Sequence, residues 1–516
     1  MSVRSVGKPR GARVGRPRTK VADLRRAGLY EPDFVARLWE QSAPQCLELG
    51  PAQHARPPRG LTTLEYRCDR PGLTGFAGMP ALMKFAYSVG LSDRLGGLPI
   101  RKRDSVYSPS KLCEVVVAIL AAGLERVAHV DEVSHDPGLC AALGLERLPD
   151  QATLSRFFGE VRPSQVRHLR QVNRAFSRQT VAPRARPRRL VVDGDTRVVG
   201  VYGKQEGAKA SPRNGGDPQF TFEITTLRNS YDILDGGLLE GVTHPAPLFA
   251  QRFEAIVEQL GSETDEMIWC ADAAWYAAHI LQRIEAADED ETVPCACKYA
   301  IRAQIRGGLR QAIAALPEEA WRRCDADIQI AELSFAFRET RAGKDERARR
   351  YIVTRKRLPE RGADSSQGVL VPQPRYEFGA IVTSLAWKPR QVWALYNQRA
   401  TIETILKESA LGFQMDHLPS GRFAGNELFS QLLILSYNLV NLFRRLCLSP
   451  EDARRHVQGL RRMVLAVPGF VERRRDGLIL HCADVGPHVQ RLRHILEALD
   501  RWLEPLRGWW TPAAAT

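Results

Sequence analysis

The sequence predicts a mixed α/β protein whose central strands are flanked by helices on both sides along the chain. Three segments have the β-branched and aromatic content of strands: residues 190–202, 220–227 and 266–270. Residues 248–260 carry the apolar spacing of a helix between two of these strands. Helical periodicity also runs through residues 77–180 and 390–447, before and after the strand-rich part.

In chain order, composition and periodicity divide the chain into six segments. They are a basic, Pro- and Gly-rich arm at 1–60, a helical region at 61–183, a first α/β part at 184–275, an inserted and partly β part at 276–390, a helical part at 391–447 and a basic helical tail at 448–516. Strand-like runs at 327–335, 350–354 and 376–383 are the reason to expect β structure in the insertion.

Length and composition predict an ordinary globular protein with no membrane partner. The chain has 516 residues, 44% of them hydrophobic, and a formal net charge of +15. Its longest apolar runs, residues 115–124 and 432–435, are too short to span a bilayer. The basic N-terminus lacks the apolar stretch of a signal peptide. We therefore expect a cytoplasmic protein, located at the nucleoid if it acts on bacterial DNA.

The ten cysteines indicate neither a metal site nor a disulfide framework. The closest pair is Cys295 and Cys297, and no two cysteines have the CxxC spacing. Cysteines scattered in this way predict free thiols in a reducing compartment.

The first 26 residues concentrate positive charge, with nine Lys and Arg against Asp23 alone. Such a cluster is either a solvated arm or an arm that binds DNA phosphates by releasing their counterions. Gly15-Arg16-Pro17 matches the core of an AT-hook, which would lay Arg16 into a minor groove. A generic basic arm explains the composition equally well.

A second candidate for DNA contact lies in the helical region. Asp150 is placed to cap a helix that continues to Phe158. Thr153, Ser155 and Arg156 would then be exposed as in the second helix of a helix-turn-helix motif. An amphipathic helix that packs on its neighbours is an equally good interpretation.

Two aspartate positions follow or end predicted strands. Asp193 and Asp195 point to the same face of their strand, because side chains alternate with a period of two. Like charges placed together are costly without a cation, so either aspartate is a candidate ligand. Asp272 follows the strand at 266–270, where a helix N-cap is the common alternative.

A polar stripe runs along the helix predicted near residue 400. Spacings of three, four and four residues place Tyr396, Arg399, Glu403 and Lys407 within about 80° of one another. An exposed ladder of salt bridges, Arg399 with Glu403 and Glu403 with Lys407, would explain the same pattern.

Separate carboxylates of this kind suit metal-assisted phosphoryl transfer. Mg²⁺ prefers oxygen ligands and is usually held by a few carboxylates together with water and phosphate. Two such ions, roughly 3.5–4 Å apart, can activate an attacking oxygen and stabilise the leaving oxygen. In a strongly basic protein, the natural phosphate substrate is nucleic acid.

The residues around these carboxylates resemble those of a known family, the DDE transposases of bacterial insertion sequences. The likeness is to the "thirteen-eighty" group of the IS-four type superfamily and spans roughly residues 75–445. The matching blocks, in order, are DGDTRVVGVYGKQEGA at 193–208, CADAAWY at 270–276, YNQRATIE at 396–403, DHLPSGRFAGN at 416–426 and LSYNL at 435–439. The third block matches the start of the superfamily signature Tyr-x2-Arg-x3-Glu-x6-Lys.

The resemblance implies an RNase H-like catalytic core interrupted by a β-rich insertion. It selects Asp195 over Asp193 as the first catalytic carboxylate and adds Asp272 and Glu403. These three residues would bind two Mg²⁺ ions, with Mn²⁺ as a substitute. The protein would cleave and join double-stranded DNA, both transposon ends and target, as a homodimer and with no small-molecule cofactor.

The resemblance also implies further contacts with DNA. Tyr396 and Arg399 would hold phosphates near the scissile bond, Arg399 through its bidentate fork, and Lys204 and Gln205 would lie near the transposon end. In relatives, an aromatic residue of the insertion holds a flipped base, for which Trp321 and Trp387 are the candidates. Residues 77–180 would recognise the terminal inverted repeats, and the tail at 448–516 is a candidate dimer interface.

One position departs from the family signature. Its last Lys, seven residues after Glu403, is Ala410 here, and Lys407 is a candidate substitute on the same stripe. A DNA-binding regulator that has lost catalysis is therefore one alternative to an active cut-and-paste transposase. A domesticated, metal-dependent DNA nuclease is another.

Overall fold

The structure is a computed structural model of the chain. It describes the ranges 69–99, 106–181, 189–244, 246–336, 347–358, 376–475, 477–482 and 486–508. The basic arm with Arg16, and Trp509 and Trp510, lie outside these residues, and so does the side chain of Trp502. The chain from Pro71 onward forms one compact unit. None of the helices in the described ranges is both long enough and apolar enough to span a membrane.

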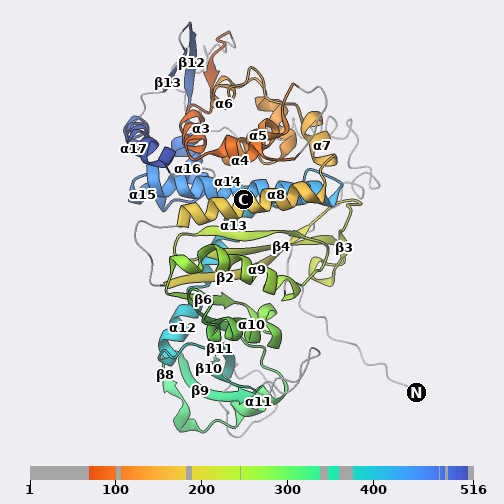
Figure 1. Cartoon of the computed structure of the whole chain (residues 1–516), viewed down its shortest axis with the longest axis vertical. Helices are drawn as coiled ribbons and strands as arrows, with labels where there is room; N and C mark the ends of the chain where they lie inside the picture. The colour runs from red at the N-terminus through yellow and green to blue at the C-terminus, as the bar shows by residue number, and fades with distance from the viewer. Residues whose placement is uncertain are drawn as a thin grey trace, which may run out of the picture. The chain divides into compact units, whose positions relative to one another are not determined.

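The expected mixed α/β class is confirmed by a large mixed sheet (Figure 1). Its central strands are β2 (Arg189–Gly200), β4 (Pro218–Leu227), β5 (Asp232–Leu239), β6 (Glu266–Ala271) and β7 (Ala296–Arg302). They lie side by side in the order β5-β4-β2-β6-β7. The pairs β5–β4 and β4–β2 are antiparallel, whereas β2–β6 and β6–β7 are parallel.

The strands after β7 extend the same sheet rather than forming a separate one. They are β8 (Arg322–Arg323), β9 (Ile328–Ala336), β10 (Ala348–Arg357) and β11 (Tyr376–Thr383), and the two-residue strand β3 (Lys209–Ala210) pairs with β4 at the other side. β11 pairs with β7 in antiparallel fashion, and β10, β9 and β8 follow outward. The three β runs expected in the insertion therefore correspond to β9, β10 and β11.

Helices cover both faces of the central strands. One face, where Leu190 and Val192 point, packs against α9 (Phe249–Leu260) and α10 (Ala278–Glu289). The other face, where Val191 points, packs against α12 (Pro389–Asn397). Because side chains alternate along β2, Asp193 and Asp195 share the α12 face with Val191.

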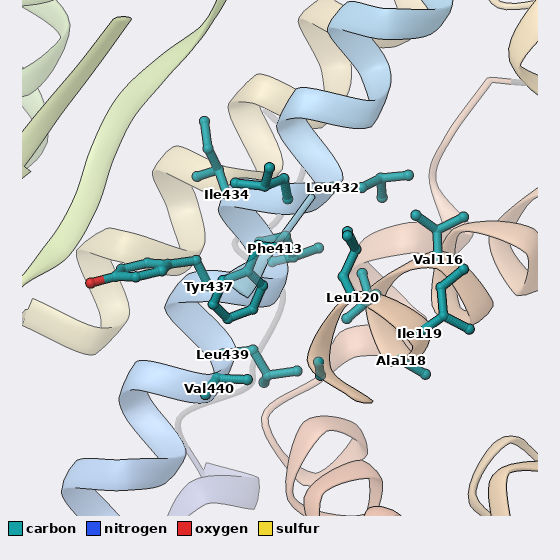
Figure 2. Close-up of a cluster of buried hydrophobic side chains, with 14 of the residues drawn as sticks. Val116, Ala118, Ile119, Leu120, Phe413, Leu432, Ile434, Tyr437, Leu439 and Val440 are labelled. Carbon is teal, nitrogen blue, oxygen red and sulfur yellow. The ribbon is translucent and has the colours of Figure 1, made fainter. Parts of the chain in front are cut away.

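Two long helices join the sheet to the helices of the N-terminal part. α8 (Pro163–Val181) and α14 (Phe423–Cys447) lie side by side, and both contact β5 (Figure 1). α14 also contacts α5 (Pro109–Ala122), whose side chains Val116 and Leu120 point toward α14 in Figure 2. Every side chain from Leu112 to Ala122 is buried, so α5 is a core helix of the molecule.

The remaining helices are shorter, and all but α11, which packs on β9, lie around this core. They are α3 (Met79–Ser88), α4 (Leu91–Gly96), α6 (Pro137–Leu143), α7 (Gln151–Gly159), α11 (Gly307–Ala314), α13 (Ala400–Gly412), α15 (Pro450–Ala453) and α16 (Val457–Leu460). The cap expected at Asp150 is confirmed, since its carboxylate accepts the N–H of Thr153 at 2.7 Å.

The C-terminal segment differs from the expected helical tail. It contains a hairpin of β12 (Gly469–Arg474) and β13 (Gly477–Cys482), and β12 also pairs with β1 (Leu73–Thr74). Only α17 (His488–Gly508) is a long helix, and it packs against α3 and α14. The sequence Asp-Gly at 476–477, where β13 begins, is a hairpin signal that the helical interpretation of this basic segment overlooked.

Candidate active site

The two aspartates of β2 have different environments. Asp193 is 1% exposed and accepts Nε–H of Arg228 at 2.8 Å, while Nη1 of the same arginine donates to the carbonyl of Leu395. Burial raises the pKa of Asp193, and Arg228 opposes that shift. Asp193 is therefore one half of a buried ion pair that ties β2 to the end of α12.

Asp195 and Asp272 lie at neighbouring positions of two parallel strands. Gly194 pairs with Ala271, so the next residue on each strand, Asp195 and Asp272, is at the same level of the sheet. Met267, Trp269 and Ala271 pack in the core under α9 and α10, which directs Asp272 to the opposite face, where Asp195 also points.

Asp272 also has the local role that its position allows. Its carboxylate accepts the N–H of Ala274 at 3.0 Å and so caps the single turn Ala273–Trp275. The alternative role, as a helix cap, is thus present in the structure. This bond holds the Asp272 carboxylate at the end of β6.

The stripe expected on one helix is divided between two. α12 ends at Asn397 and α13 begins at Ala400, with Gln398 and Arg399 in a turn between them. Tyr396 is on α12, half-buried, whereas Glu403 and Lys407 are exposed on α13. Within the described ranges, no ion pair joins Glu403 to Arg399 or to Lys407, so the salt-bridge ladder is not formed.

Arg399 turns inward and binds the first aspartate. It is 9% exposed, its Nη2 lies 3.0 Å from Oδ2 of Asp195, and the same nitrogen donates to the carbonyl of Gly194 at 3.3 Å. The other carboxylate oxygen of Asp195 accepts the N–H of Thr196 at 2.8 Å. The buried Nε of Arg399 has no hydrogen-bond partner among the residues that the structure describes.

The three candidate carboxylates influence one another electrostatically. Burial raises the pKa of Asp195, Arg399 lowers it, and the negative charges of Asp272 and Glu403 raise it further. The charges of Asp272, at the end of β6, and of Glu403, on α13, thus disfavour the ionised form of Asp195 on β2.

The three carboxylates have the chemistry that a hard cation binds, but their spacing in this structure does not form a metal site. Carboxylate oxygens are the ligands that Mg²⁺ prefers. However, among the described residues no three His, Cys, Asp or Glu side chains are placed to hold a metal ion together. The guanidinium of Arg399 supplies the positive charge at Asp195 in this arrangement.

Tyr396 belongs to the same surroundings. Burial raises its pKa to about 12, the cations Arg399 and Arg302 lower it, and Asp272 adds to the rise. The phenol therefore stays protonated at neutral pH and is able to donate a hydrogen bond to a phosphate.

Arg302 is a site residue that the sequence did not single out. Ala271 pairs with Ile301, so Arg302 continues the row formed by Asp195 and Asp272 on a third strand. Tyr299 and Ile301 pack under α9 and α10, and Arg302 accordingly points to the carboxylate face. Finding it requires the register of β6 against β7, because its own neighbours in sequence form an ordinary strand end.

The departure at Ala410 has a structural meaning. Ala410 is 7% exposed and packs in the core shared with α5 and α14. Seven residues after Glu403, Ala410 keeps the same side of α13, but this end of the helix is buried. Lys407 is exposed one turn earlier, where α13 still faces outward.

The loop after β2 separates the two residues expected at the transposon end. Lys204 is exposed, whereas Oε1 of Gln205 accepts a hydrogen bond from Nδ2 of Asn426 at 3.1 Å. Gln205 thus holds this loop against the start of α14. Nearby, Arg197 forms an ion pair with Asp416 at 2.9 Å, so the first and fourth family-like blocks meet in space.

Both tryptophans named for the insertion carry an arginine on the ring. Arg355 lies 4.5 Å from the ring centre of the buried Trp321, and Arg189 lies 4.3 Å from that of the half-buried Trp387. In the helical region, Leu154 and Phe157 of α7 are buried, as packing predicts, while Arg156 is exposed.

Comparisons with known proteins bear on this arrangement. Among solved structures, one match is a piggyBac transposase synaptic complex with hairpin DNA, studied by cryo-electron microscopy; it has 11% sequence identity, covers 87% of this chain and 89% of that one, and gives a TM-score of 0.42. Comparison with curated proteins gives no match. The family model described as "Transposase DDE domain group 1" matches residues 64–503, and the chain therefore belongs to this family of transposases.

Proposed function

We propose that the protein is a cut-and-paste transposase whose active site is Asp195, Asp272 and Glu403. The observation that carries the proposal is the placement of these carboxylates on the sheet and on α13. Two stand level on adjacent parallel strands, and the third acts on Asp195 from α13. We place the chain in the "thirteen-eighty" group of bacterial insertion sequences, on the five sequence blocks described above.

The strand order supports an RNase H-like core within this proposal. Three antiparallel strands, β5, β4 and β2, are followed by two parallel strands, β6 and β7, with helices on both faces. In this arrangement the first carboxylate is central on β2, and the second follows the adjacent parallel strand.

Each charged residue of the site has a role in this proposal. Asp195, Asp272 and Glu403 would hold divalent metal, Mg²⁺ or Mn²⁺, which when bound supplies the charge stabilisation for in-line displacement at a phosphate. Tyr396 and Arg302 would donate hydrogen bonds to phosphate oxygens near the scissile bond. Arg399 would exchange its contact with Asp195 for one with phosphate, and exposed Lys407 would bind the backbone farther along.

The substrate in this proposal is double-stranded DNA that carries the element's terminal inverted repeats. Cleavage at two ends and joining to target DNA would require a homodimer. Ala410 remains the sequence feature that favours a catalytically inactive regulator, and the intact carboxylates are the reason to prefer an active enzyme.

The test is a cleavage assay with purified protein, Mg²⁺ or Mn²⁺, and a DNA fragment carrying the element's flanking ends. We expect end-specific cuts, and we expect Asp195→Asn, Asp272→Asn and Glu403→Gln to abolish them while DNA binding persists. If one of these variants cuts at the wild-type rate, that residue is not a ligand. If the wild type binds the ends but cuts with neither metal, the proposed activity is wrong.

A further inference from the structure

The loop that follows the catalytic strand forms a built surface together with the loop that precedes α14. The N–H of Glu206 donates to the carbonyl of Gly421 at 2.9 Å, and the N–H of Phe423 donates to the carboxylate of Glu206 at 3.2 Å. Phe423 also packs against Phe220 of β4, with ring centres 5.7 Å apart.

The buried side chain of Asn426 connects these two loops. Its amide bonds to the N–H and the carbonyl of Ser420 at 2.9 and 2.8 Å and to Gln205 at 3.1 Å. Asn426 is fully buried. These hydrogen bonds join the loop after β2 to the loop before α14.

Three side chains of these two loops are exposed to solvent. Tyr202 is 81% exposed. Lys204, two residues later in the same loop, and Arg422, in the loop before α14, are also exposed. Glu206, which lies 3.8 Å from Arg422, is already engaged by the N–H of Phe423 at the start of α14. We call Tyr202, Lys204 and Arg422 the Tyr202 surface.

The composition of this surface fits nucleic acid. Cationic side chains bind phosphates and set the position of a duplex, whereas uncharged rings contact sugars and base edges. A rigid aromatic side chain also loses little conformational entropy when it binds. Tyr202 has these properties: it is exposed on the loop that carries Lys204, and that loop is hydrogen-bonded to the loop that carries Arg422.

The distance of the Tyr202 surface from the catalytic Asp195 follows from their positions along β2. Gly200 ends β2 five residues after Asp195, which is about 17 Å at the usual rise of a strand, and Tyr202 lies two residues farther. One strand of a DNA duplex advances 3.4 Å per base pair, so this span corresponds to roughly five to seven base pairs.

We propose that the Tyr202 surface binds the transposon-end duplex about five to seven base pairs from the scissile phosphate. Lys204 and Arg422 contact phosphates, and Tyr202 contacts the groove between them. Gln205 is a positioning residue, because it orients the loop through Asn426. This inference rests on the proposed function for the identity of the DNA.

The test measures binding and phosphate interference on the end duplex in Ca²⁺, with the full chain. We expect Tyr202→Ala to weaken binding roughly tenfold, the effect of about 1.4 kcal/mol, and Tyr202→Phe to retain most of it. The double variant Lys204→Ala, Arg422→Ala should lower the salt slope by about two and remove interference five to seven base pairs from the cut.

The matched control is Arg283→Ala, which removes an exposed arginine from α10 on the opposite face of the sheet. It should leave binding and the interference pattern unchanged. Glu403→Gln separates the two proposals, because it should abolish cutting and keep the interference pattern. If the wild type cuts the ends while the Tyr202 and double variants keep wild-type affinity and interference, the Tyr202 surface is not a DNA contact.

Discussion

Asp193 and Asp195 show how two identical residues, two positions apart, acquire different roles. Both point to the same face of β2, but Asp193 is enclosed and paired with Arg228, whereas Asp195 lies among other carboxylates beside Arg399. The sequence leaves both as candidates, because alternation reports the face and not the partner.

This difference predicts opposite effects of the two asparagine substitutions. Asp193→Asn leaves Arg228 buried without its partner and should lower the free energy of unfolding by about 3–5 kcal/mol. Asp195→Asn also removes an ion pair, with Arg399, but burial, Asp272 and Glu403 all oppose the charge of Asp195, so we expect a smaller loss of stability together with complete loss of cleavage. Thermal unfolding and cleavage of the same preparations would decide this. An Asp193→Asn protein that melts normally and cannot cut would make Asp193 the ligand instead.

Arg399 gives a second prediction at this scale. Its guanidinium competes with a metal ion for Asp195, since both supply positive charge to the same carboxylate. Arg399→Met should therefore tighten Mn²⁺ binding to the DNA-free protein by roughly tenfold, the effect of about 1.4 kcal/mol, while cleavage falls because a phosphate contact is lost. Calorimetric titration with Mn²⁺ measures the first effect, and Lys407→Met, which removes an exposed cation of α13, is the control. Unchanged Mn²⁺ affinity would show that the ion pair does not restrain the site.

At the scale of elements, sequence patterns predicted helices and strands well but not the way they turn. Tyr396 and Glu403 were placed on one helix, and the break between α12 and α13 was invisible because Gln398 and Arg399 both keep helical dihedral angles. Periodicity likewise could not show that the end of α13 packs in the core and buries Ala410, because its packing partners are distant in sequence. Arg302 was missed for a similar reason: strand register is a property of pairs.

The orientation of α13 predicts what a lysine at position 410 would do. Ala410→Lys would force a long charged side chain into a packed core and should cost about 1–3 kcal/mol without raising cleavage. Leu411→Lys is a matched control, because the neighbouring Leu411 is 75% exposed and should accept lysine at little cost. The two melting temperatures and cleavage rates, compared side by side, test this. A faster and equally stable Ala410→Lys protein would restore the family signature as a functional position.

Across the whole molecule, segments distant in sequence share one core. α14 contacts the N-terminal helices α5 and α7 and also β5 of the catalytic sheet, while β1 near residue 73 pairs with β12 of the C-terminal hairpin. The expectation of a helical tail at 448–516 is therefore right for α15, α16 and α17 and wrong for β12 and β13. Such long-range pairing depends on the complete fold, and one-dimensional periodicity does not report it.

The basic arm is the part of the chain whose role can be tested through charge alone. Residues 1–26 hold nine cations, and each phosphate contact contributes about 0.9 to the slope of log affinity against log salt. Removal of these residues should weaken binding to DNA of any sequence and flatten that slope by several units, as measured by titration at a series of salt concentrations.

Arg16→Ala and Arg13→Ala then separate the two explanations of the arm. If Arg16 enters a minor groove, only its variant should lose a preference for A·T-rich DNA, because width and potential favour arginine there; equal small effects of both variants indicate a generic basic arm. An unchanged slope after the deletion would mean that the DNA contacts lie entirely in the folded part of the protein.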